Sequence, residues 1–255
     1  MKELELQLGG LLLVFSRVAG LFLFAPILAS VTVPMRVRAM LGITFALIIW
    51  LSLPREMQLA EMPDVFTAGW LVLVETAMGM IIGLIALLPV IAVQLGSALF
   101  GQQMGFGLAA VYNPALETES DVLGEMMLYL ALGVFLSFGG IEKVFLAVAM
   151  SFVATPPGTF SLSAAPLLLV QTVITAGTEL ALRIALPVLC VLGIETLATA
   201  FITKTMPQLN VMSLGYGIKI MMGIVALIGS LIAVQSVLGD HLRETFDQLT
   251  LWLSL

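Results

Sequence analysis

Residues 100–121 read FGQQMGFGLAAVYNPALETESD, and they separate two long apolar segments. A glycine in a helix interior costs about 1 kcal/mol relative to alanine, so Gly101, Gly105 and Gly107 predict an irregular segment here rather than a helix. Met104 and Phe106 are nevertheless too apolar for a loop surrounded by water. A flexible backbone with large apolar side chains suits a compressible seal, and it equally suits an ordinary re-entrant loop buried by surrounding protein.

The composition is that of a membrane protein. Of the 255 residues, 60% are hydrophobic and only 10% are charged, whereas soluble proteins average about a quarter charged residues. The net charge of −6 comes from thinly spread groups without a basic cluster, so the sequence does not support nucleic-acid binding. We expect an integral membrane protein, or part of a membrane-associated assembly, in contact with lipid.

The apolar segments predict an all-α fold of helical hairpins with kinked helices. The first segment shows no processing site, so we expect a retained first helix. Pro89 is expected to break the third segment, Gly139-Gly140 the fourth, and Pro187 to kink the next one. The charged end of the chain, residues 239–255, predicts a separate amphipathic helix at the membrane interface. The expected apolar segments are 6–28, 36–53, 65–100, 122–138, 144–153, 167–201 and 213–238.

Six ionisable residues interrupt these apolar segments: Arg17, Glu75, Glu179, Arg183, Glu195 and Lys219. A charge at the bilayer centre costs about 3 kcal/mol on insertion scales, so these helices are expected to face protein or water. Glu179 and Arg183 are four residues apart and can pair on one helix face. The pair suits either an ion relay or a buried structural ion pair. Lys and Arg divide almost evenly between the two sides of the membrane, so they do not predict the topology.

Residues for catalysis or metal binding are missing. His241 is the only histidine and Cys190 the only cysteine, so the chain does not supply the ligands of a typical zinc site. The sequence contains no G-x-S-x-G, H-E-x-x-H or nucleotide-binding G-x-x-x-x-G-K-[ST] motif. The alternating Glu117, Glu119 and Asp121 are better explained as acids before a helix N-terminus than as metal ligands. We therefore expect no enzymatic activity, no metal and no cofactor.

Several short motifs follow one another along the chain: Ala25-Pro26-Ile27-Leu28, Val33-Pro34, Arg36-Val37-Arg38, Gly101-Gln102-Gln103-Met104-Gly105, Asn113-Pro114, Met206-Pro207-Gln208-Leu209-Asn210-Val211, and Leu214-Gly215 with Lys219. In order and spacing they resemble the FliR family, the flagellar biosynthesis proteins of the bacterial type III export gate. The likeness covers nearly the whole chain. It departs from the family at Gly139-Gly140-Ile141-Glu142, where FliR proteins often have Asn-Gly-His-His or a similar sequence.

The resemblance implies a subunit of a helical complex with FliP-like and FliQ-like subunits, in the bacterial inner membrane at the flagellar basal body. FlhB-like and FlhA-like proteins would associate with it, and unfolded export substrates would pass through its pore. Residues 1–200 would be FliP-like, and residues 201–255 with the preceding kinked helix FliQ-like. The energy for export would come from the proton motive force and a separate ATPase.

The resemblance also assigns residues. The central segment, from Met104 to about Pro114, would act as a plug of the closed pore, with Met104, Phe106 and Leu108 as sealing residues. Gly101, Gly105 and Gly107 would be its hinges, and Gln103, Asn113 and Pro114 would belong to the same gating segment. The remaining motif residues would be structural: Pro26, Pro34, Arg36, Pro207, Gln208, Asn210, Gly215 and Lys219.

Other functions remain open at this point. A subunit of the injectisome SctT family is the nearest alternative, because that family shares the Pro207-Gln208-Leu209-Asn210 stretch. A small-solute permease would also use proline-broken helices and intramembrane charge. It is less favoured, since no internal repeat is visible. A membrane enzyme is disfavoured by the missing catalytic residues.

Overall fold

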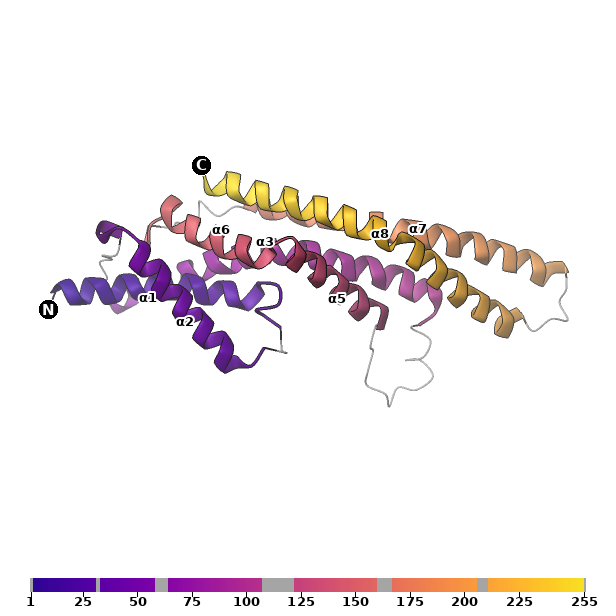
Figure 1. Cartoon of the computed structure of the whole chain (residues 1–255), viewed down its shortest axis with the longest axis horizontal. Coiled ribbons are helices and arrows are strands. Elements are labelled where there is room, and N and C mark those ends of the chain that lie inside the picture. The colour runs from indigo at the N-terminus through magenta and orange to yellow at the C-terminus, as the bar shows by residue number, and fades with distance from the viewer. Residues whose placement is uncertain are drawn as a thin grey trace. The chain divides into compact units, whose positions relative to one another are not determined.

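The computed structural model describes residues 2–30, 33–57, 64–106, 122–159, 167–205 and 211–254. These residues form α-helices and one short 3-10 turn, and no strand occurs among them (Figure 1). The all-α expectation is confirmed. The helices are α1 Lys2–Phe24, α2 Met35–Ser52, α3 Val65–Met104, α5 Val122–Ser137, α6 Gly140–Ala154, α7 Leu167–Thr205 and α8 Val211–Leu253, with the 3-10 turn η1 at Arg55–Met57.

Five of the helices are long and apolar enough to cross a membrane, and the number rises to six if the bent pair α5–α6 counts as one span. The pair is bent by 63° at Gly139. This residue adopts a left-handed conformation, φ 71°, which only glycine enters without steric cost. The break predicted at Gly139-Gly140 is confirmed. Length and composition thus agree with a membrane protein.

Two expected interruptions do not occur. α3 continues through Pro89, and α8 continues to Leu253 instead of ending before a separate tail helix. In α8 the reason is packing: Leu242, Phe246 and Leu249 recur on one helix face and are buried. Tertiary burial of that stripe extends the helix beyond its apolar part.

The contacts divide the chain into two compact units. Unit 1 comprises Met1–Leu88, Phe135–Ile174 and Leu242–Leu255, and unit 2 comprises Pro89–Val134 and Thr175–His241. Pro89 thus lies at a boundary of the units. The expected division near residue 200 rests on a family likeness, and these units do not test it.

In unit 1, glycines bring the backbones of α1 and α3 into contact. A Cβ atom on Gly79 would overlap the carbonyl oxygen of Arg17, and one on Gly20 would overlap the carbonyl oxygen of Thr76. A Cβ on Gly83 would lie 3.0 Å from a backbone oxygen of α1. Small residues at this spacing let two membrane helices approach closely. The Gly79-x-x-x-Gly83 motif therefore has a packing role.

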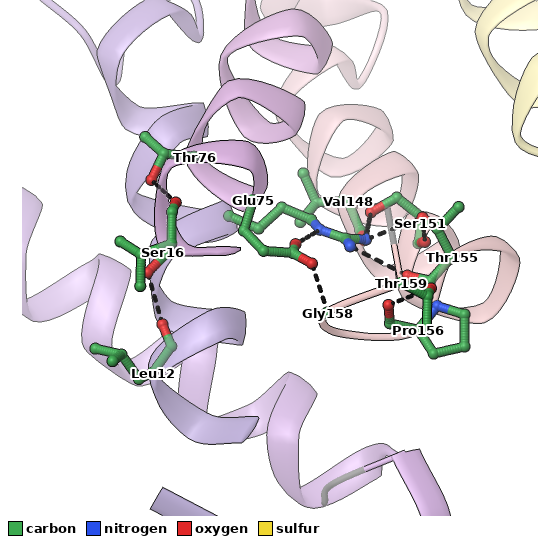
Figure 2. Close-up of polar contacts among 12 residues, drawn as sticks. Leu12, Ser16, Glu75, Thr76, Val148, Ser151, Thr155, Pro156, Gly158 and Thr159 are labelled. Atoms are coloured by element: carbon green, nitrogen blue, oxygen red, sulfur yellow. Dashed lines mark hydrogen bonds and ion pairs between the residues drawn. The ribbon is translucent and has the colours of Figure 1, made fainter. Parts of the chain in front are cut away.

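This close approach buries an ion pair. The Nε of Arg17 donates to Oε2 of Glu75 at 2.6 Å, and the two side chains are 0% and 1% exposed. The guanidinium also donates to Oγ of Ser151 at 3.0 Å and to the carbonyl oxygen of Thr155 at 3.1 Å. The second carboxylate oxygen of Glu75 accepts the N–H of Gly158 at 2.8 Å. Figure 2 shows Glu75, Ser151 and Thr155 converging from α3, α6 and the turn after α6.

The remaining face of the guanidinium is also covered. Its central carbon lies 4.1 Å from the centre of the Phe152 ring, at cation–π distance. A buried charge is tolerated when it is paired and its donors are satisfied. Because Arg17 lies in α1 and its partners lie in α3, in α6 and in the turn after α6, this one group links three helices of unit 1.

Replacing Arg17 with methionine should leave the Glu75 carboxylate buried without its cation. Breaking a buried pair in this way costs about 3–5 kcal/mol. We expect Arg17→Met to lower the free energy of unfolding by that amount, measured by denaturation of the purified protein in detergent. The double variant Arg17→Met/Glu75→Leu should recover most of the loss, since two apolar side chains leave no charge stranded. A double variant as unstable as Arg17→Met would contradict the stranded-charge explanation.

Gly79→Ala should force α1 and α3 apart, because the added methyl group meets backbone rather than a flexible side chain. Overpacking of this kind typically costs about 1–3 kcal/mol. Gly69→Ala is the matched control, since Gly69 lies in the same helix and a Cβ there meets nothing within 4 Å. The measurement is the thermal midpoint of both variants. Equal midpoints would show that the helix contact is not tight at Gly79.

Candidate functional site

The C-terminal end of α3 is the candidate functional site, because the segment predicted to be a plug begins there. The helix continues through Phe100 and Gly101 to Met104. This corrects the expectation that glycine would prevent a helix from residue 100 onward. Phe100 and Met104 are fully buried in unit 2. The free energy gained by burying these two side chains is larger than the free energy lost by placing one glycine in a helix.

Gly105 ends the helix through a specific backbone geometry. Its φ is 92°, in the left-handed region, and its N–H donates to the carbonyl of Gln102 at 3.0 Å. The N–H of Phe106 donates to the carbonyl of Gly101 at 3.2 Å. These two bonds are those of a Schellman motif, in which glycine is the preferred left-handed residue. The sequence motif around Gly105 therefore ends the helix. Gly105, one of the predicted hinges, is the left-handed residue of this turn.

Two residues of α8 hold this turn. The hydroxyl of Tyr216 donates to the carbonyl oxygen of Gly105. The side chain of Met104 fills the space beside Gly223, where an added Cβ would lie 2.6 Å from the methionine methyl carbon. Sequence reasoning missed Tyr216 and Gly223. No pattern links them to residue 105, because only the folding of α8 against α3 brings them together.

The predicted sealing residues differ in exposure. Met104 is fully buried, whereas the next apolar side chain, Phe106, is 40% exposed. Within the gating segment, Gln103 is exposed and Gly101 is buried. The other predicted plug residues, Gly107, Leu108, Asn113 and Pro114, lie outside the described part of the chain.

The predicted structural residues are spread along the described chain. Pro26 is buried in the turn after α1, Pro34 precedes α2, and Arg36 is exposed at its start. Gly215 and Lys219 lie in the first turns of α8 and are partly exposed. Pro207, Gln208 and Asn210 lie outside the described residues.

The turn that contains Pro26 is strained. Ile27 has a φ of 69°, and the N–H of Leu28 donates to the carbonyl of Pro26 at 2.8 Å. A branched side chain in the left-handed region is an outlier that costs about 1–3 kcal/mol and persists only when surrounding contacts hold it. Ala25, Pro26 and Leu28 are buried. Packing therefore imposes this conformation on the first family motif.

Glu179 and Arg183 form the predicted pair at 2.6 Å, but their side chains are 61% and 64% exposed. Within the described chain no other element covers the face of α7 that carries the two residues, so a buried structural role for this pair among partner subunits stays a prediction. The buried ion pair is that of Arg17 and Glu75. Glu195 is also buried and accepts a hydrogen bond of 2.6 Å from the Thr199 hydroxyl. Among the described residues no cluster of His, Cys, Asp and Glu could hold a metal ion.

Comparisons with known proteins agree on one family. The model of the bacterial export proteins, family 1, matches residues 8–245. The flagellar biosynthetic protein FliR of Escherichia coli is 29% identical, over 91% of this chain and 88% of its own length. FliR of Pectobacterium carotovorum is 28% identical, over 92% and 89%. The Yop proteins translocation protein T of Yersinia pestis is 25% identical, over 61% and 60%. The chain therefore belongs to the bacterial export proteins of family 1.

Proposed function

We propose that this protein is a structural and gating subunit of the bacterial flagellar type III protein export gate. In this role it is not an enzyme. It forms, with FliP-like and FliQ-like subunits, the pore through which unfolded substrates pass, and its central segment closes that pore. The match to the export family over nearly the whole chain supports the assignment to the export apparatus.

The flagellar assignment is favoured over the injectisome by coverage. The FliR relatives from Escherichia coli and Pectobacterium carotovorum align with about nine tenths of the chain, whereas the Yersinia translocation protein aligns with 61%. The part of the chain beyond that alignment thus has its likeness in the flagellar proteins.

The observation that carries the gating proposal is the change of burial at the end of α3. Met104 is fully buried in unit 2, and two residues later, in the same unit, Phe106 is 40% exposed. An apolar ring costs free energy in water. A partly exposed aromatic ring at the start of the central segment suits a plug that contacts neighbouring subunits inside a narrow pore.

The exposed apolar faces support partner subunits and lipid as neighbours. On α8, Met221, Val225, Ile228 and Ile232 are exposed and recur every three or four residues, so they form one stripe. In unit 1, α2 exposes Met35, Met40 and Leu51. Of the five described helices that could span a membrane, α2 is the least buried. Exposed apolar side chains that gather in one stripe mark protein or membrane contacts. In the proposed gate, FlhB-like and FlhA-like proteins associate with the complex in the inner membrane of the flagellar basal body.

The two-part division expected from the family likeness belongs to this proposal. The FliP-like part would end near residue 200, and the last two long helices would supply the FliQ-like hairpin. α7 and α8 are 39 and 43 residues long and are joined by a short connection, residues 206–210, which suits such a hairpin.

Replacing residues 107–114 with a Gly-Ser segment of equal length should open the gate without preventing its assembly. Met104, Gly105 and Phe106 are kept in this variant, because Met104 is part of the packed unit. We expect the complex to form in normal yield and the cells that produce it to leak ions and small solutes. The measurement is the permeability of those cells compared with cells that produce the unmodified complex. An assembled complex with unchanged permeability would remove residues 107–114 from the plug.

Purification of the tagged chain in mild detergent should recover FliP-like and FliQ-like subunits in fixed ratio. The reason is that the exposed stripes need apolar neighbours. Mass spectrometry of the recovered complex identifies the partners. A homo-oligomer that transports a small solute after reconstitution would instead support the permease alternative.

A further inference from the structure

The helix α2 differs in sequence from the other helices that could cross a membrane. Among these five described helices, α1, α3, α7 and α8 each carry an ionisable residue within their apolar part, such as Arg17 in α1 and Lys219 in α8. Between Arg38 and the end of α2 at Ser52 there is none. A charge held in hydrocarbon carries a large free-energy cost. Of the five, α2 is therefore the helix whose sequence permits lipid along its whole apolar length.

Most of the surface of α2 is exposed. Its buried residues, Gly42, Ala46 and Ile49, recur every three or four residues and form one narrow stripe. This stripe faces α1, because an atom of the Phe22 ring lies 3.8 Å from the place of a Cβ on Gly42. A partner subunit would cover one more side of such a helix, whereas hydrocarbon covers every side that is left. The exposed apolar side chains are Met40, Leu41, Ile43, Leu47, Ile48 and Leu51.

The length and the last turn of α2 also fit a bilayer. At 1.5 Å per residue its 18 residues span about 27 Å, close to a hydrocarbon core of about 30 Å. The exposed Ser52 hydroxyl donates to the carbonyl oxygen of Ile48 at 2.7 Å, so this polar group is satisfied inside the helix. Trp50 is half-buried in the same turn. Tryptophan is enriched where a membrane meets water, so this end of α2 suits the interface.

The first turn of α2 carries two arginines, Arg36 and Arg38. The positive end of the helix dipole favours anions there, but the first turn contains no acidic residue. Residues 6–55 contain no aspartate or glutamate at all. Among the described residues neither arginine forms an ion pair. Arg36 is exposed, and Nη2 of Arg38 donates to the carbonyl oxygen of Ser30 at 2.6 Å. The start of α2 is therefore positive, and the described chain supplies no compensating group.

We propose that α2 faces the acyl chains of the bilayer, and that Arg36 and Arg38 bind the phosphates of anionic phospholipids at its start. The two side chains leave the helix on different sides, because residues two apart do not face each other. They therefore contact separate headgroups around the helix. Arginine suits this contact, since its guanidinium can donate to two phosphate oxygens at once. The lipid contact does not depend on the gating proposal.

Spin labels on α2 test the contact with acyl chains. They are attached at Met40→Cys or Ile48→Cys, in a Cys190→Ser background and in the purified protein with the subunits that copurify. The protein is placed in vesicles of phosphatidylcholine and phosphatidylglycerol. We expect both labels to be accessible to oxygen, which concentrates in hydrocarbon, and inaccessible to a water-soluble nickel chelate. A label at Arg55→Cys, an exposed residue beyond the end of α2, is the control that the chelate should reach.

The other outcomes of the labelling overturn the acyl-chain contact. Labels on α2 that neither reagent reaches would show that a partner subunit covers the helix. Labels that the nickel chelate reaches would show that the helix faces water.

Lipid binding tests the two arginines. Native mass spectrometry of the purified protein counts bound phosphatidylglycerol and phosphatidylcholine as each lipid is added. Each arginine near an anionic surface strengthens binding about fivefold, so Arg36→Gln/Arg38→Gln should lower the affinity for phosphatidylglycerol about twenty-five-fold. Affinity for phosphatidylcholine should not change. The matched control Arg55→Gln/Arg243→Gln removes two charges from exposed arginines elsewhere in unit 1 and should behave like the unmodified protein.

The single variant Arg36→Gln separates lipid binding from folding, because it keeps the bond between Arg38 and Ser30. It should lower the affinity for phosphatidylglycerol about fivefold. An equal loss in the two double variants would show a general attraction of charge and overturn the headgroup contact. Equal losses for both lipids would show a damaged apolar surface, and unchanged binding of both would show that the arginines contact no headgroup. Either result overturns the assignment of Arg36 and Arg38.

Discussion

The buried charge of Arg17 is the constraint on which unit 1 depends. An uncompensated guanidinium in an apolar interior is too costly to keep, so its donors must find partners wherever the fold places it. Those partners are Glu75 in α3, Ser151 in α6 and Thr155 just after α6. The requirement for partners therefore selects one arrangement of the helices among those that apolar packing alone would allow. Apolar contacts are not directional, whereas this network is.

Small residues make that network possible. Gly20 and Gly79 let the backbones of α1 and α3 touch, and the contact at Gly79 is made with the carbonyl of Arg17 itself. The ion pair is short because the helices are close at that level. Unit 2 follows the same rule: a Cβ on Gly96 would lie 2.7 Å from the carbonyl oxygen of Ala181, and Gly223 receives Met104. In both units, a glycine lets a second helix approach closely, and a larger side chain, Arg17 or Met104, packs at that contact.

The end of α3 joins this packing to the proposed function. A fully buried methionine, a left-handed glycine and a partly exposed phenylalanine follow one another at residues 104–106. Within three residues the chain passes from core to surface. The Schellman motif and the Tyr216 bond fix the direction in which the chain leaves α3 as far as Phe106. The central segment therefore begins at Gly105 from a backbone position that hydrogen bonds hold in place.

Composition and hydropathy determined the helical class and the membrane character, and the adjacent glycines determined the break at Gly139, because these depend on local propensity and apolar content. The family came from the resemblance of short motifs in their order along the chain. The partners of Arg17 and of Gly105 were beyond such reasoning. Glu75 is 58 residues from Arg17 and Tyr216 is 111 residues from Gly105, and no local rule relates positions so far apart. The same limit applies to Glu179 and Arg183: a spacing of four residues predicts that two side chains meet, but only the packing of neighbouring helices determines whether water reaches them.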